Sequence, residues 1–398
     1  MQCGALTRVA VLSAASVLIG ATATPTPAPT PTPAPAGPPR EQVVQFGRYD
    51  YTVDTAHPLP YQADNWPFEV LQRGYAGQVS ALRGAETSKL PMTFLFYADP
   101  MVIRPSDHLG YTTALPASWV QMYHPDWLLR DARGDMIGRS GGGDDIMMDP
   151  GNPAYQQLAG DNLVAIMTAE GWAGVMLDEL NQTWTWTMTD PPAGYPTERS
   201  WDQAEIALVK TVCGKVIAAG RLCLTNTGDY HDDEDFWNAI TDLNSGSSQE
   251  FYMALQPGLG NAPTAATIEN GWWLPAEQRL FASQFDRKDG FFHAYAAGPA
   301  LVGYALGSYL LAWQGYGTFA ASAEVNGAYN GSDTWTPDFD AARKLGQAVG
   351  QLQFAGKLMW RPFQHGYVIV NPHDTPQTAF VEAGWRTLPP TSAQIVAY

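Results

Sequence analysis

The sequence predicts an α/β fold: a (β/α)8 TIM-type barrel followed by a small C-terminal antiparallel β unit. Short apolar runs alternate with stretches of helical spacing along most of the chain, as in βα units wound around a parallel sheet. Roughly 360 residues follow a low-complexity N-terminus, a length that suits one barrel with a small appendage. From about residue 350 the apolar runs shorten and alternate, with Pro and Gly between them, which predicts antiparallel hairpins.

Each element can be placed from its local pattern. The expected barrel strands are residues 43–53, 92–97, 144–148, 174–177, 221–225, 247–253, 290–295 and 318–323. The expected helices are residues 67–82, 154–169, 202–219 and 301–313, and Asn152-Pro153 supplies the cap and first turn of the second one. The C-terminal unit is expected to contain strands at 357–360, 366–371, 379–382 and 395–398. We therefore assign the barrel to residues 40–349 and the β unit to residues 350–398.

The first 39 residues predict export. Arg8 precedes an apolar run at 9–19, and Ala21-Thr22-Ala23 fits a cleavage site, so residues 1–23 are interpreted as a signal peptide. Residues 24–39 alternate Pro with Thr and Ala, a composition typical of an extended linker. We expect a secreted or cell-surface protein, and a permanent N-terminal anchor is the alternative.

The charge balance excludes one class of partner. The chain has 22 Lys and Arg residues against 39 Asp and Glu, a formal charge of −17, whereas nucleic-acid phosphates require a basic face. No other long apolar segment predicts a membrane span in the mature chain. The 14 Trp, 18 Tyr and 15 Phe residues suit stacking against sugar rings, although aromatic residues also fill ordinary cores. The sequence does not indicate an oligomeric state.

Two cysteines remain after export, Cys213 and Cys223, on either side of a helix-to-strand connection. An oxidising compartment would permit a disulfide between them. The alternative is that both cysteines are buried free thiols. The apolar residues around them argue against a catalytic thiol.

The clearest candidate for chemistry is the acidic pair Asp178-Glu179. The apolar strand 174–177 runs directly into it, and working residues in a parallel barrel emerge at the C-terminal ends of the strands. Burying an unpaired carboxylate is costly, which favours a polar site here. A loop carboxylate that caps the next helix is the alternative.

Glycoside hydrolysis generally needs two carboxyl groups, so Asp178 requires a partner. Glu250, in the expected strand 247–253, is the best candidate, with a surface acid on an edge turn as its alternative. Asp50 also falls near a strand end and is a candidate substrate-binding residue. Asp99 is followed by Pro and is interpreted as a turn residue, and Asp149 as a helix cap.

The loop after the acidic pair has the composition of a sugar subsite. Trp184 and Trp186 could line it by stacking, while Glu179 and Asn181 position the sugar. Tyr97, at the end of the strand 92–97, is a further candidate substrate-binding residue. We find no metal-binding histidine pattern, no nucleophile elbow and no phosphate loop, and therefore expect no metal and no cofactor.

Several short segments together resemble the hypothetical glycosyl hydrolase 15 family of TIM-barrel proteins, which is related in layout to α-amylase-like and α-galactosaminidase-like barrels. The segments are residues 94–97, 124–131 with Gly134 after them, 148–155, 171–178, 345–346 and 361–372. The chain departs from the family pattern at Trp172-Ala173, where Phe-Asp is usual, and around Glu250. The resemblance implies a barrel with Asp178 at the catalytic strand end and Glu250 as its partner.

The leading hypothesis is a secreted glycoside hydrolase that cleaves a polysaccharide or oligosaccharide. Asp178 would act as nucleophile or base and Glu250 as general acid. A non-catalytic glycan-binding protein on the same scaffold and a transglycosylase are the alternatives.

Overall fold

A computed structural model describes residues 43–50, 57–86, 92–106, 115–141, 143–181, 183–184, 188–228, 234–255, 264–295, 298–322, 335–382 and 384–398. The predicted signal peptide and linker lie outside these residues. The described residues all belong to one compact unit, Gly37–Tyr398. Within them, no helix is both long and apolar enough to span a membrane.

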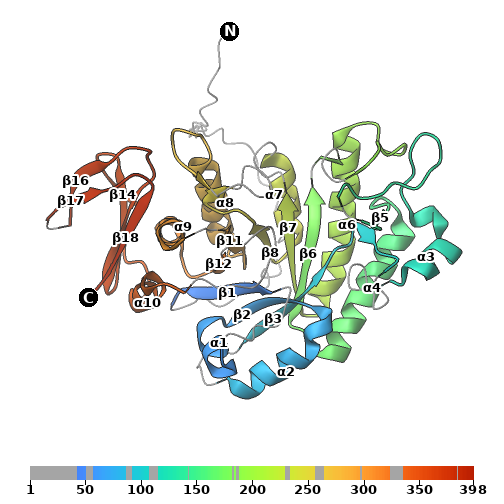
Figure 1. Cartoon of the computed structure of the whole chain (residues 1–398), viewed down its shortest axis with the longest axis horizontal. Helices are drawn as coiled ribbons and strands as arrows, with labels where there is room; N and C mark the ends of the chain where they lie inside the picture. Colours follow the sequence, from blue (N-terminus) through green and yellow to red (C-terminus); the bar gives the residue numbers. More distant parts are fainter. Residues whose placement is uncertain are drawn as a thin grey trace, which may run out of the picture. The chain divides into compact units, whose positions relative to one another are not determined.

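The predicted barrel is confirmed: eight parallel strands of the described chain close on themselves (Figure 1). In barrel order after β1 they follow the sequence order, with each strand paired to its neighbours in parallel register. The strands are β1 (Gln45–Asp50), β2 (Phe68–Gln72), β3 (Thr93–Ala98), β6 (Gly174–Asn181), β7 (Leu222–Gly228), β8 (Gly246–Gln249), β11 (Phe291–Tyr295) and β12 (Thr318–Ser322).

Helices follow most of the strands. They are α1 (Leu59–Asn65), α2 (Ala76–Ala85), α3 (Ala117–Tyr123), α4 (Pro153–Glu170), α6 (Glu198–Ala218), α7 (Glu234–Leu243), α8 (Trp273–Phe285), α9 (Pro299–Ala312) and α10 (Pro337–Lys344). As expected, Asn152 caps α4, accepting hydrogen bonds from the Ala154 and Tyr155 amides. Gly171 ends that helix in the left-handed conformation.

Three expected elements are wrong in type or extent. Residues 67–82 begin with the barrel strand β2, because a Phe-Glu-Val-Leu run is buried before α2 starts. Residues 144–148 contain β5 (Ile146–Met147), which pairs antiparallel with β4 (Val102–Ile103) outside the barrel. The strand expected at 247–253 ends at Gln249, and the chain then turns.

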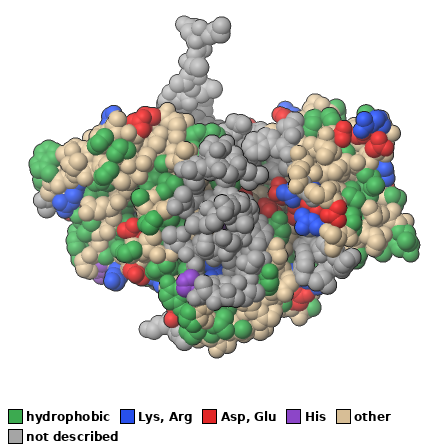
Figure 2. Space-filling model, in the orientation of Figure 1, with side chains coloured by type: hydrophobic (Ala, Val, Ile, Leu, Met, Phe, Trp, Pro, Cys, Tyr) green, Lys and Arg blue, Asp and Glu red, His purple; other side chains and the backbone are tan. Residues whose placement is uncertain are grey.

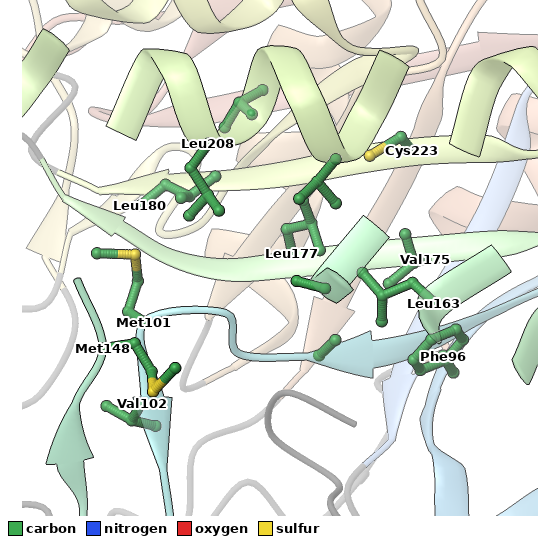
Figure 3. Packing of buried hydrophobic residues seen from close by; sticks show 14 of the residues in the cluster. Phe96, Met101, Val102, Met148, Leu163, Val175, Leu177, Leu180, Leu208 and Cys223 are labelled. Carbon is green, nitrogen blue, oxygen red and sulfur yellow. The ribbon is translucent and has the colours of Figure 1, made fainter. Parts of the chain in front are cut away.

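The apolar core lies between the strands and the helices. On β6, Val175, Leu177 and Leu180 belong to one buried cluster with Leu163 of α4 and Leu208 of α6 (Figure 3). Period-two alternation sends the intervening residues of the strand into the barrel. Tight helix packing therefore fixes β6 and, with it, the direction of the acidic residues at its end.

Cys213 and Cys223 form a disulfide that joins α6 to β7, with a Cα–Cα distance of 5.4 Å. Both residues are buried in the same cluster. Of the two alternatives left open by the sequence, the structure has the disulfide.

The predicted C-terminal antiparallel unit is confirmed. One sheet has the order β13 (Gln353–Ala355), β14 (Leu358–Phe363), β15 (Gly366–Asn371) and β18 (Ser392–Ala397). A hairpin of β16 (Gln377–Val381) and β17 (Gly384–Leu388) accompanies it. Val368 and Val370 join the same buried cluster as Leu306 and Leu310 of α9, so the unit packs on the barrel.

Candidate active site

The C-terminal end of the barrel interior carries a polar layer above an apolar one. Inward residues of the apolar layer are Val70, Leu95, Met176, Leu224, Phe291 and Ala320. Because side chains alternate along a strand, the next inward positions lie two residues later. These positions are Gln72, Tyr97, Asp178, Asn226, His293 and Ser322. The chain therefore switches from apolar to polar residues at one level of the barrel.

Asn226 connects the two carboxylates predicted from the sequence. Its Nδ2 group donates one hydrogen bond to Asp178 Oδ1 and another to Glu250 Oε2, each at 2.8 Å. Since both oxygens lie 2.8 Å from one nitrogen, they are at most about 5.6 Å apart. Asp178 is buried and Glu250, directly after β8, is half-buried. The structure thus brings Asp178 and Glu250 together, although 72 positions separate their numbers in the sequence.

A β-bulge in β6 sets the directions of the Asp178 and Glu179 side chains. The register of β6 against β7 shifts between Leu177 and Leu180, so that two residues of β6 face one residue of β7. Glu179 occupies this bulge with φ 59°, a left-handed conformation that is unfavourable for a residue with a side chain. Bulges of this kind are common at barrel rims beside active sites. The bulge keeps Asp178 inside the barrel and lets Leu180 return to the helix-facing core.

An arginine from the long β3–α4 connection binds three carboxylates around the site. Arg139 donates to Asp99 Oδ2 at 3.0 Å and forms an ion pair with Glu179, and one of its nitrogens lies 3.8 Å from Asp145 Oδ2. Asp99, directly after β3, is almost fully buried and also accepts a hydrogen bond from the Met101 amide. In the orientation of Figure 1, Figure 2 shows acidic and basic side chains gathered near the end of β6.

Burial shifts the ionisation of these acids. Desolvation raises the pKa of Asp178, while hydrogen bonds from Tyr97 and Asn226 and the charge of Arg139 oppose the rise. Desolvation raises the pKa of Asp99 to about 7, against the opposing charge of Arg139 and with a contribution from the Asp178 charge. The site therefore holds one carboxyl group, Asp99, that exchanges its proton near neutral pH, and a second, Asp178, whose pKa is raised. Shifted carboxyl groups of this kind are typical of acid–base centres.

Aromatic side chains line the opposite part of the barrel mouth. The ring of Tyr49 on β1 stacks on His293, with centroids 6.2 Å apart, and meets Tyr97 edge to face at 6.0 Å. His293 Nε2 lies 2.8 Å from Ser322 Oγ. Burial lowers the pKa of His293 to about 3, so this imidazole is neutral at physiological pH. A neutral, partly aromatic wall of this kind suits a sugar ring better than an ionic ligand.

The predicted site residues have different outcomes. Asp178, Glu250 and Tyr97 converge in one place. Glu179 instead points to Arg139, and its role in sugar positioning stays a prediction. Trp184 is half-buried and packs against the large core cluster. Trp186 and the side chains of Asp50 and Asn181 lie outside the described residues.

Sequence reasoning missed Asn226 and Arg139 and underrated Asp99. Asn226 could have been found, because it lies two positions after the inward Leu224 on an expected strand. The interpretation of Asp99 as a turn residue was incomplete, since its side chain is paired inside the site. Nothing local marks Arg139, which lies in an irregular connection 40 positions from both Asp99 and Glu179. Asp149 does not cap α4; its carboxylate accepts hydrogen bonds from the Gly151 amide and the Tyr195 hydroxyl.

Within the described part of the chain, no group of three or more His, Cys, Asp or Glu residues is arranged to hold a metal ion. The sequence also contains an acidic run, residues 232–235. Its first two residues lie outside the described part, and Glu234 and Asp235 begin α7.

Solved structures resemble the chain in fold. An α-amylase from Malbranchea cinnamomea aligns with a TM-score of 0.51 and 8% identity, over 89% of this chain and 95% of that one. An α-galactosidase of family GH36 from Geobacillus stearothermophilus aligns with a TM-score of 0.44 and 11% identity, over 86% and 50% of the two chains. A cycloisomaltooligosaccharide glucanotransferase from Paenibacillus sp. aligns with a TM-score of 0.41 and 10% identity, over 63% and 38%. The chain thus spans half the length or less of the last two proteins.

No curated protein matches the sequence significantly. The sequence profile of hypothetical glycosyl hydrolase family 15 matches residues 91–367, which include β3, β6, β7 and β8 with Asp178, Asn226 and Glu250. This match covers more than half of the chain. The chain belongs to hypothetical glycosyl hydrolase family 15.

Proposed function

We propose that the protein is a secreted glycoside hydrolase that cleaves glycosidic bonds of a polysaccharide or oligosaccharide with Asp178 and Glu250. The observation that carries the proposal is the shared contact of both carboxylates with Asn226 at the barrel mouth. The family match and the fold support a glycoside-active barrel. The predicted signal peptide supports export.

The spacing of the carboxylates favours a retaining mechanism. Retaining glycosidases hold their two carboxyl groups about 5–5.5 Å apart, whereas inverting enzymes leave about 6.5–9.5 Å for a water molecule. The two oxygens bound to Asn226 are limited to about 5.6 Å by their common donor. This upper limit on the distance between the two oxygens lies below the range of inverting enzymes.

We assign Asp178 as the nucleophile because it points into the barrel from the end of β6 beside three groups that stabilise a carboxylate. Burial raises its pKa, and hydrogen bonds from Tyr97 and Asn226 and the charge of Arg139 oppose that rise. An Asp178 oxygen attacks the anomeric carbon while Glu250 donates a proton to the departing glycosidic oxygen, which gives a covalent glycosyl-enzyme. Glu250 then removes a proton from water, the water oxygen attacks the same carbon, and Asp178 leaves as a carboxylate. Glu250 is only half-buried, so its carboxyl group can exchange protons with solvent.

The experiment is a screen of the mature chain, residues 24–398, against soluble and insoluble polysaccharides and aryl glycosides, with reducing-end release as readout. Asp178→Asn and Glu250→Gln should each lower kcat at least about a thousandfold while remaining folded. A 2-deoxy-2-fluoroglycosyl fluoride of the cleaved sugar should label the peptide that contains Asp178. Full activity in both variants would refute the assignment. Glycan binding without turnover in the wild type would favour a binding protein, and lengthened products would favour a transglycosylase.

A further inference from the structure

The segment that carries Glu250 has an unusual backbone. Two of the next three residues, Phe251 at φ 57° and Met253 at φ 58°, adopt left-handed conformations without being glycine. Such conformations persist only where the surrounding structure holds them. Because Glu250 directly precedes this turn, the direction of its side chain depends on what holds the turn.

Tyr252, between the two left-handed residues, is the anchor of the turn. Its backbone N–H donates to the carbonyl oxygen of His293 on β11 at 2.9 Å. Its side chain is fully buried, with the ring edge-on to Phe292 at 5.5 Å. Its hydroxyl donates to Glu277 Oε1 at 2.7 Å. The backbone of Tyr252 is therefore bonded to the barrel strand β11, and its hydroxyl is bonded to a carboxyl group of α8.

Glu277 has no place in the proposed chemistry, yet it is a carboxyl group held in the interior. Its side chain lies on the buried face of α8 with only 7% of its surface exposed. Burying a carboxyl group is unfavourable unless it is well bonded. A phenylalanine ring could fill the same apolar space. The hydrogen bond between the Tyr252 hydroxyl and Glu277 therefore fixes the orientation of the turn beyond what apolar packing does.

We propose that Glu277 is a positioning residue that fixes Glu250 toward Asp178 through the buried hydroxyl of Tyr252. The inference rests on the proposed function, because it takes Glu250 as the general acid. Loosening Tyr252 frees the two left-handed residues to relax and moves the Glu250 carboxyl away from the glycosidic oxygen. Displacement of about 1 Å at such a group can reduce the rate about a hundredfold.

The distinguishing readout is dependence on the leaving group. A 2,4-dinitrophenyl glycoside departs without protonation, whereas a phenyl glycoside of the same sugar needs the general acid. In Tyr252→Phe and Glu277→Ala, kcat/KM for the phenyl glycoside should fall at least about tenfold more than for the dinitrophenyl glycoside. Glu277→Gln should restore the wild-type ratio, because its carbonyl oxygen accepts the same bond. Burial raises the pKa of Glu277 to about 8, so the resident group is largely uncharged at neutral pH, like the amide.

Ser308→Ala is the matched control. Ser308 accepts a buried hydrogen bond from Trp273 Nε1 at 3.2 Å and so joins α8 to α9 through a bond separate from that of Tyr252 and Glu277. This variant should loosen α8 to a similar extent and leave the ratio unchanged. If the variants act only by disturbing the fold, kcat/KM should fall equally for the phenyl and the dinitrophenyl glycoside in all of them. That result would overturn the proposal.

Glu250→Gln separates this inference from the proposed function. If Glu250→Gln shows no leaving-group dependence, Glu250 is not the acid and the proposed function fails. If Glu250→Gln shows leaving-group dependence and Glu277→Ala does not, only the positioning role of Glu277 fails. Hydrogen exchange gives a second test that needs no substrate: amides of residues 251–255 should exchange at least about tenfold faster in Glu277→Ala than in wild type, Glu277→Gln or Ser308→Ala. Unchanged exchange in Glu277→Ala would overturn the proposal.

Discussion

Asp178 and Glu250 accept hydrogen bonds from the two hydrogens of a single amide group, Nδ2 of Asn226, at 2.8 Å each. Asp178 lies on the fourth strand of the described barrel, Glu250 directly follows the sixth, and Asn226 lies on the strand between them. Asn226 therefore sets both the distance between the acids and their orientation. Its hydrogen bond to Asp178 also opposes the rise in the pKa of that carboxyl group without adding a charge.

Replacing Asn226 should impair catalysis more than folding. In Asn226→Ala the ionised nucleophile Asp178 loses a hydrogen bond, which is worth about 1.5–3 kcal/mol for a charged acceptor, so kcat/KM should fall roughly 10- to 100-fold. Asn244→Ala is a suitable control, because the Asn244 amide donates to Thr225 and Ser247 instead. Equal activity per folded molecule in the two variants, measured on the substrate found by screening, would argue against a role for Asn226.

The hydroxyl of Tyr97 should control the acid limb of the pH profile. Its hydrogen bond lowers the pKa of Asp178, so Tyr97→Phe raises that pKa further. The nucleophile must be ionised, and the acid limb of kcat/KM should therefore move to higher pH in Tyr97→Phe. Tyr195→Phe, which removes a hydroxyl bonded to Asp149, should leave the limb in place. A shift to lower pH in Tyr97→Phe would contradict the assignment.

Asp99 should make the protein less stable as pH rises. Its pKa is about 7 in the folded protein against 3.8 for the unperturbed group, so its contribution to stability is full below about pH 4 and lost as pH rises through about 7. In Asp99→Asn, the fall in unfolding free energy between pH 4 and pH 8 should be shallower, by at most about 1.4 kcal/mol per pH unit. Urea unfolding across this range tests the slope. Asp135→Asn, whose side chain is 73% exposed, should keep the wild-type slope.

The disulfide should stabilise the protein without serving the reaction. Cys213 and Cys223 are 10 positions apart in the sequence, and closing so short a loop is worth about 3 kcal/mol in the chain-entropy account. The double variant Cys213→Ala, Cys223→Ala should lose stability of this order in denaturant unfolding and keep its kcat at 25 °C. Reductant should lower the unfolding midpoint of the wild type only. A matching effect of reductant on the double variant would show that the loss has another origin.

Local patterns in the sequence were enough for most of the barrel. The apolar run before Asp178 identifies β6, and Asn152-Pro153 marks the start of α4, because both signals are contained within a few neighbouring residues. The same reasoning failed for β2. Its residues are buried on both sides, so they lack the alternation that distinguishes a strand from a buried helix.

Candidate acids could be proposed from the sequence, but their pairing could not. Strand-end position singled out Asp178 and Glu250 individually. Whether they face each other depends on the register of β6, β7 and β8 and on the bulge at Glu179, which are long-range properties.

Local sequence patterns were sufficient to predict the α/β barrel, the C-terminal β unit and the acidic end of β6, because each follows from composition or from periodicity within a short window. Export stays a prediction from the first 23 residues. Only the tertiary structure decided that Asn226 joins Asp178 to Glu250, that Arg139 pairs with Asp99 and that Tyr252 reaches Glu277. The physical reason is that closing the barrel brings together side chains from distant parts of the chain. Their contacts and ionisation depend on that shared buried environment, which no single segment encodes.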